Sequence, residues 1–185
     1  MSGRVLSLLP LLVLAAPARP ARPPEAPAAR AFARLCEERT GDEGLLACRR
    51  AIELGLAPER LDAVRELLSR KLVGLERWPE LVQHFREEVA RHPDHPDGHF
   101  RLGAALLYVA DQPEEALGPL REAIRLDPDG APAQAALGVA LDVLGRFEEA
   151  VAAFRAAERV DPALFERQPA ARAVFEAAQK AARWP

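Results

Sequence analysis

A two-helix pattern returns along this chain every 34 to 35 residues, and this period limits the possible folds more than any other feature. Leu102-Gly103 recurs as Leu137-Gly138. The following positions match in size at a spacing of 34: Ala116 with Ala150, Leu120 with Phe154, Ala123 with Ala157, and Asp127-Pro128 with Asp161-Pro162. A chain with such a period folds as stacked copies of one supersecondary unit, because a single copy cannot bury its own apolar stripe.

The same register extends upstream, where Leu68-Ser69 stands in the place of Leu-Gly and again supplies a small residue. The repeat therefore predicts three helical pairs, over residues 62–95, 96–130 and 131–164. Each pair is expected to pack on its neighbours, since stacking buries the apolar faces that single pairs leave exposed.

In the third pair, the apolar spacing predicts helices over residues 133–144 and 147–160, the first ended by Gly145. Residues 31–58 have the pattern of a shorter helical hairpin. Residues 169–184 predict an amphipathic helix that caps the last repeat.

The composition favours an all-α fold. The chain is rich in Ala, Leu, Arg and Glu and poor in the β-branched residues that sheets favour. Apolar residues make up 49% of it, which argues against a disordered chain. With 25 basic and 28 acidic side chains there is no basic excess to neutralise phosphates, so nucleic-acid binding is not expected.

The 34-residue spacing, with its small, large and Pro positions, resembles the tetratricopeptide repeat. The resemblance implies an all-α solenoid of antiparallel helix pairs, wound as a right-handed superhelix. It also implies a protein–protein interaction module rather than an enzyme. In such a module the first helices line a concave groove that holds a peptide or helix from a partner protein.

The groove residues implied by this resemblance lie beside the core stripe of each first helix. They are Glu66, Arg70 and Val73 in the first repeat, Phe100, Ala104, Leu107 and Tyr108 in the second, and Ala135, Val139, Asp142 and Val143 in the third. Family members that clamp a partner's terminal carboxylate use Lys, Asn and Arg at such positions, whereas Arg70 is the only cation in this set. The mostly apolar positions therefore predict apolar anchors from the partner. Alternatively, Phe100 and Tyr108 pack against the neighbouring repeat.

Residues 1–18 have the pattern of a secretory signal peptide, with Arg4, an apolar run over residues 5–16 and the small-x-small sequence Ala16-Pro17-Ala18. The run is too short to cross about 30 Å of hydrocarbon, so no stable membrane insertion is expected after cleavage. The Pro-rich residues 19–30 predict an extended linker. The alternative is an uncleaved apolar tail.

Cys36 and Cys48 lie symmetrically about residue 42, the centre of the turn in the first hairpin. An antiparallel helix pair would place them opposite each other, as a disulfide requires, and export would let the bond persist. The bond would add roughly 2–3 kcal/mol to the free energy of unfolding. The alternative is two buried thiols in small apolar positions.

The sequence offers few groups for catalysis, since it has one Thr, one Tyr and no Gly-rich phosphate loop or zinc-type Cys spacing. Neither enzymatic activity nor a cofactor is expected. His92, His95 and His99 form the tightest polar cluster and, with Asp94 and Asp97, would suit zinc or copper. Their place in a Pro-Asp turn between repeats favours a solvated turn instead, so no metal site is predicted.

These features together predict an exported adaptor or assembly factor in the periplasm of a Gram-negative bacterium, or a secreted one, which binds a partner peptide in its groove. The Ala, Arg and Pro excess and the absence of Asn suggest a GC-rich genome. One alternative is a structural scaffold or homo-oligomer subunit that makes contact through its convex face or its ends. A second alternative is a metal-binding protein that uses His92, His95 and His99.

Overall fold

The computed structural model describes residues 26–183, and these form ten α-helices with no strand in that range. The helices are α1 (Pro27–Glu38), α2 (Gly41–Leu54), α3 (Pro58–Gly74), α4 (Trp78–Arg91), α5 (Pro96–Tyr108), α6 (Pro113–Leu126), α7 (Ala131–Val143), α8 (Phe147–Val160), α9 (Leu164–Arg167) and α10 (Pro169–Ala181). The predicted signal peptide and most of the predicted linker lie outside the described residues. None of the described helices combines the length and the apolar character needed to span a membrane.

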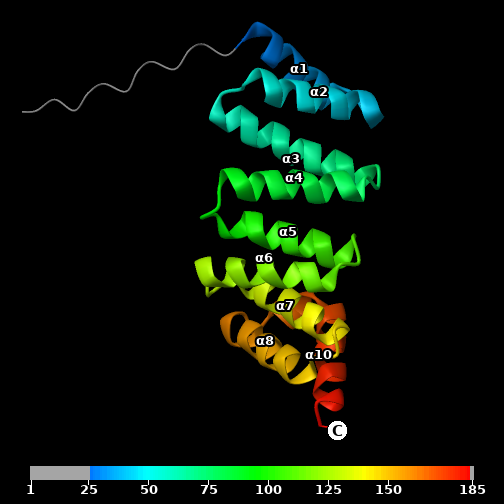
Figure 1. Ribbon diagram of the computed structural model, residues 1–185, viewed down its shortest axis with the longest axis vertical. Coiled ribbons are helices and arrows are strands. Elements are labelled where there is room, and N and C mark those ends of the chain that lie inside the picture. Colours follow the sequence, from blue (N-terminus) through cyan, green and yellow to red (C-terminus); the bar gives the residue numbers. More distant parts are fainter. Residues whose placement is uncertain (1–25, 184–185) are drawn as a thin grey trace, which may run out of the picture.

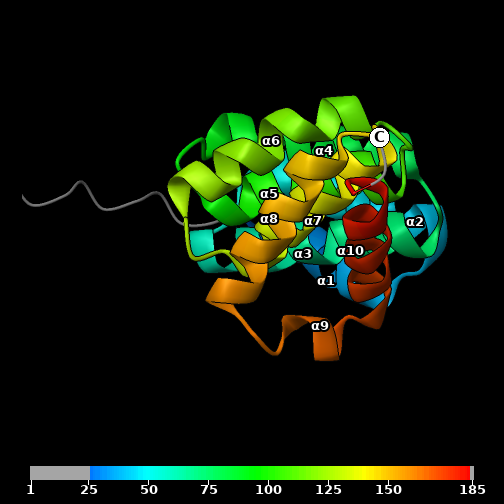
Figure 2. The same ribbon diagram turned by 90° about the horizontal axis from the view of Figure 1, so that it is seen from below.

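Four helix pairs stack in chain order along the long axis of the molecule, from α1 and α2 at one end to α7 and α8 at the other (Figure 1). Seen along this axis, α4 and α6 lie on one side of the stack and α1 and α3 on the other (Figure 2). The predicted α-solenoid of helix pairs is confirmed.

In the α5/α6 and α7/α8 pairs, a glycine on the first helix faces a large buried side chain on the second. A Cβ added at Gly138 would lie 2.9 Å from three carbons of the Phe154 ring, and one added at Gly103 would lie 2.6 Å from Leu120 Cγ. Phe154 and Leu120 are fully buried, so neither has free space to move into. The repeated Leu-Gly pattern therefore marks the crossing point of the two helices.

Helix α1 begins at Pro27, so the prediction of an extended linker up to residue 30 was wrong for its last four residues. Proline is compatible with the first turn of a helix, where its missing N–H needs no partner. Ala29 is fully buried and packs into the core, which holds this turn in place.

The α1/α2 hairpin is built like the later pairs. When α2 and α8 are aligned at their first residues, each buried position of α8 has a buried counterpart in α2: Gly44 with Ala150, Leu45 with Val151, Cys48 with Phe154, and Ala51 with Ala157. Cys48 thus stands in the large-residue position, and it is bonded to Cys36 with 4.7 Å between the two Cα atoms. A disulfide closes this pair where an aromatic ring closes the last one.

Helix α10 packs on α7 and α8 and covers the free flank of the last pair. Three aromatic rings join these elements: Phe154 of α8, Phe165 of α9 and Phe175 of α10, with centroids 5.3 to 6.1 Å apart. All three side chains are buried. α10 therefore has the role of a capping helix, which keeps the apolar flank of a terminal repeat out of water.

Glycine and proline lie at or near the ends of several helices, and one proline lies inside a helix. Gly145 has a φ of +72°, the left-handed conformation expected of a residue that ends a helix. Helix α7 begins two residues before the predicted start because Pro132 is accommodated in its first turn. Pro119 lies inside α6, which nevertheless continues to Leu126.

Candidate peptide-binding surface

The first helices of the four pairs, α1, α3, α5 and α7, contribute a surface that we call the A-helix face. At the C-terminal ends of three of them, this face carries one exposed apolar or aromatic side chain per repeat. Val73, Tyr108 and Val143 are 49%, 60% and 59% exposed, and they are 35 residues apart. We call this row the apolar ladder. Their recurrence at the same position of successive repeats makes them candidate contacts for a partner.

Tyr108 and Asp142 are accessible to solvent and yet partly desolvated. Burial by surrounding atoms raises the pKa of the Tyr108 phenol above its ordinary value, although more than half of the side chain is exposed. Burial likewise raises the pKa of the Asp142 carboxyl, next to the ladder residue Val143. Both shifts have the same cause, since desolvation disfavours the charged form.

Three equivalent clefts lie between successive first helices, near the N-terminal ends of these helices. The first is lined by Pro27, Arg30, Arg34 and Arg60 and has a volume of about 360 Å³. The second, of about 380 Å³, is lined among others by Asp62, Arg65, Glu66, His95, Asp97 and Arg101. The third, of about 220 Å³, is lined among others by Pro96, Phe100, Asp127, Gly130, Pro132 and Ala133. Arg30, Arg65 and Phe100 are 35 residues apart, as are Arg60, His95 and Gly130, so the three clefts are one site repeated.

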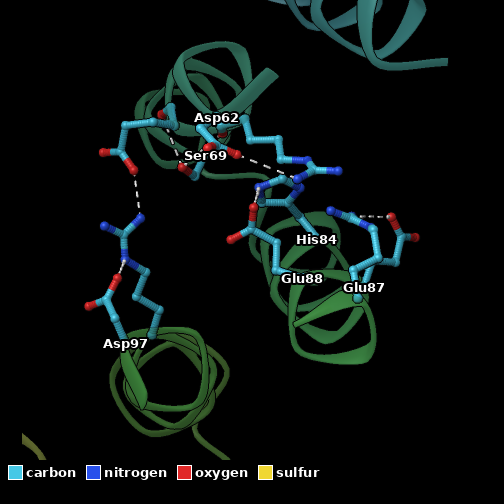
Figure 3. Close-up of polar contacts among 10 residues, drawn as sticks. Asp62, Ser69, His84, Glu87, Glu88 and Asp97 are labelled. Carbon is cyan, nitrogen blue, oxygen red and sulfur yellow. Dashed lines mark hydrogen bonds and ion pairs between the residues drawn. The ribbon is translucent and has the colours of Figure 1, made fainter. Parts of the chain in front are cut away.

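The chemistry of these equivalent clefts changes along the stack. Among the described residues, the first cleft is lined by three arginines and by no carboxylate. In the second cleft the charges pair with one another: Arg101 donates to Glu66 at 2.5 Å and lies 2.7 Å from Asp97 (Figure 3). The third cleft is mostly apolar. A segment that runs along the A-helix face would meet a cationic, a self-neutralised and an apolar site in turn.

The α3/α4 pair carries polar groups at its centre, and its helices pack less closely than those of the other three pairs. Ser69 stands in the small-residue position, and its hydroxyl is within hydrogen-bond distance of the Arg65 and Glu66 carbonyls of the same helix, at 3.2 and 3.0 Å. His84 of α4 is buried with its Nε2 3.8 Å from Glu88 (Figure 3), and this nitrogen has no hydrogen-bond partner among residues 26–183. Burial lowers the pKa of this imidazole, against the opposing charge of Glu88.

The structure divides the predicted groove residues into two groups. Leu107 and Ala135 are buried, so their prediction as groove residues was wrong. Because α5 and α7 also pack against each other, a wider strip of each first helix is buried than packing within one pair requires. The others are exposed or partly buried: Glu66, Arg70, Val73, Phe100, Ala104, Tyr108, Val139, Asp142 and Val143.

Phe100 combines the two roles that the sequence left open. Its ring is partly buried against the core, and it also lines the third cleft. Tyr108 differs, because most of its side chain is exposed.

Sequence reasoning missed Arg30 and Arg34. Both are exposed on α1, one helical turn apart, and line the first cleft. The signal was present as an i, i+4 pair in a helix that begins at Pro27, but the Pro-rich composition assigned Arg30 to the linker. The A-helix face therefore carries the positive charges of Arg30 and Arg34 in addition to that of Arg70.

The histidine cluster is used for structure. His92 and His95 are exposed in the turn between repeats, whereas His99 is buried and its Nε2 donates to the Pro93 carbonyl oxygen at 2.8 Å. Gln134, 35 residues later, makes the equivalent bond to the proline carbonyl of the next turn at 2.6 Å. Across residues 26–183, no group of three or more His, Cys, Asp or Glu side chains is arranged to hold a metal ion.

Several solved structures share this fold. MamA from Desulfovibrio magneticus RS-1 (residues 41 to the end) has a TM-score of 0.61 at 21% identity, over 86% of this chain and 97% of that one. The TPR2B domain of yeast Sti1 in its pHsp70 complex has a TM-score of 0.56 at 21% identity, over 63% and 94%. The TPR domain of Arabidopsis OM64 has a TM-score of 0.56 at 20% identity, over 64% and 93%. At these identities the likeness shows the fold alone.

A search of curated proteins found no match. The family model described as tetratricopeptide repeat matches residues 66–131 and 106–165, which together cover more than half of the chain. Domains of this family bind peptides or proteins and are generally non-enzymatic. The repeat period, the paired helices and the glycine crossings agree with this match, and the chain belongs to the tetratricopeptide-repeat family.

Proposed function

We propose that this protein binds a segment of a partner protein along its A-helix face and acts as an interaction module without catalysis of its own. The apolar ladder is the observation that carries the proposal. Val73, Tyr108 and Val143 recur at the repeat period, and between 49% and 60% of each residue is exposed. A partner segment that covers them would remove this apolar surface from water.

The ladder is one contributor among several. Covering three half-exposed side chains of this size contributes on the order of 3–4 kcal/mol, and association itself costs at least about 4 kcal/mol. The ladder therefore cannot hold a partner alone, and the clefts at the other edge of the face must contribute. The TPR2B domain of Sti1 shares the fold and was solved in its pHsp70 complex, which supports the binding of a partner protein by a helical stack of this kind.

Tyr108→Glu tests the proposal, because it places a charge in the middle of the apolar ladder. Leu46→Glu is the matched control, since Leu46 is an exposed apolar residue on α2, a second helix. Partners captured from the cell envelope by the wild-type chain should be lost with Tyr108→Glu and kept with Leu46→Glu. Loss only with Leu46→Glu, or with Glu176→Lys on α10, would move the contact to the outer face or the capped end, as a scaffold would require.

We further infer that the protein works outside the cytoplasm, as a periplasmic adaptor or assembly factor. Two features support this: the signal-peptide pattern of residues 1–18 and the disulfide between Cys36 and Cys48. Disulfides persist in oxidising compartments and are rare in the cytosol. N-terminal sequencing and a thiol count on protein from the native envelope test this. The expected result is a chain that begins at Arg19 without free thiols, and a chain that begins at Met1 with two free thiols would refute it.

A further inference from the structure

The first cleft is lined by arginines and, among residues 26–183, by no carboxylate. Arg30 and Arg34 are exposed on α1, and neither forms an ion pair with any residue in the 26–183 range. Helices α1 and α3 begin at Pro27 and Pro58, so the positive ends of two helix dipoles border the cleft. This end of the A-helix face is therefore an attractive site for carboxylates.

The remaining arginines of the face are engaged. Arg101 is paired with Glu66 and Asp97 in the second cleft. Arg65 lies 3.7 Å from Asp62, and Arg70 lies 4.0 Å from Glu66. The free positive charge of the face is thus concentrated at α1.

The opposite end of the face has the opposite preference. The third cleft is lined mainly by Phe100 and small apolar residues, together with Asp97 and Asp127. Asp142 lies beside the ladder at this end, and burial raises the pKa of its carboxyl. An acidic side chain placed here would be desolvated beside like charge, which is unfavourable.

We propose that the bound segment is bipartite, with acidic side chains at Arg30 and Arg34 and apolar or aromatic side chains in the third cleft and on Tyr108 and Val143. This inference rests on the proposed function and adds the chemistry of the partner and its direction along the stack. The planar guanidinium matches a carboxylate with two parallel hydrogen bonds, so two arginines one turn apart suit neighbouring acidic side chains.

The length of the segment follows from helix spacing. Packed helices lie about 8–10 Å apart, so three steps from α1 to α7 span roughly 24–30 Å. An extended chain advances about 3.3 Å per residue, so this span requires about seven to nine residues. Random peptides of about fifteen residues therefore span the face, and a phage-displayed library of this length, selected on the immobilised full chain, is the probe.

Selected peptides should carry Asp or Glu in one part and apolar or aromatic residues in another. In fluorescence anisotropy, Arg30→Glu/Arg34→Glu should weaken their binding by about tenfold or more and reduce its salt dependence. Arg30→Gln/Arg34→Gln should weaken it less. The matched control, Arg155→Glu/Arg159→Glu on α8, makes the same change in net charge and should leave binding unchanged.

The outcomes separate the two proposals. Peptides that lose binding with Tyr108→Glu, but lack acidic residues and ignore the Arg30 and Arg34 changes, would overturn the bipartite inference alone. A library that gives no peptide sensitive to Tyr108→Glu would overturn the proposed function. Loss of binding with the α8 control as well would show a general charge effect and would also overturn the inference.

Discussion

The crossing of α7 and α8 depends on the hydrogen atom that Gly138 carries in place of a side chain. Gly138→Ala would bring a Cβ to 2.9 Å from the fully buried Phe154 ring. We expect the free energy of unfolding to fall by about 1–3 kcal/mol, as overpacking a closed core does. Urea unfolding measures this. Gly98→Ala is the control, because its Cβ would meet Val89 at an ordinary 3.8 Å, and it should be neutral or stabilising by up to about 1 kcal/mol.

The buried imidazole of His84 should make stability depend on pH. Burial lowers its folded-state pKa, while the unfolded imidazole takes up a proton near pH 6.5. Below that pH the unfolded state binds more protons, so stability falls as the pH is lowered from about 6.5 toward the folded-state pKa. The free energy of unfolding, measured from about pH 7.5 to 5.5, should show this slope in the wild type and in the exposed-site control His95→Gln. An unchanged slope in His84→Gln would contradict the assignment.

At the scale of the elements, the first pair should depend on its disulfide more than on its apolar packing. The bond joins residues 12 positions apart, and Cys36→Ala/Cys48→Ala should lower the free energy of unfolding by about 2–3 kcal/mol. Hydrogen exchange should show the loss of protection in α1 and α2 and little change in α7 and α8. Adding reductant should reproduce this loss in the wild type and have no effect on the double variant.

The helices were predictable where glycine and proline mark their ends. The predicted range 147–160 coincides with α8, and the start of α7 was missed by two residues because Pro132 can enter a first turn. The start of α1 was missed for the same reason at Pro27, since a Pro-rich composition does not reveal which proline begins a helix.

The binding surface was predictable only in part. The ladder residues follow from the repeat register, which is a local property of each helix. The burial of Leu107 and Ala135 and the three clefts arise between neighbouring repeats, and a period along one chain does not report how closely successive copies stack. The exposure of Arg30 on a helix could not be predicted, because the sequence pattern did not show that α1 begins at Pro27.

At the scale of the whole molecule, we expect local unfolding to be more frequent in one helix pair than in the others. Each repeat of a solenoid contacts only its neighbours, so a weak pair lowers stability locally. The α3/α4 pair is the least closely packed, and within the described chain it buries His84 Nε2 and Arg65 Nε without hydrogen-bond partners. Amides of α3 and α4 should therefore exchange faster than those of α5 to α8. Hydrogen exchange with mass spectrometry measures this, and uniform protection from α3 to α8 would contradict it.

A disulfide stabilises the first helix pair and an aromatic cluster stabilises the last one, so only the first pair is sensitive to the redox conditions. A thiol reductant would act on the bond between Cys36 and Cys48, whereas the ring cluster of Phe154, Phe165 and Phe175 has no group that it reduces. Arg30 and Arg34 lie on the hairpin that the bond holds. If the bound segment is bipartite as proposed, reduction would weaken the binding of its acidic part more than the binding of its apolar part. Binding of the whole segment would then require that the disulfide between Cys36 and Cys48 has formed.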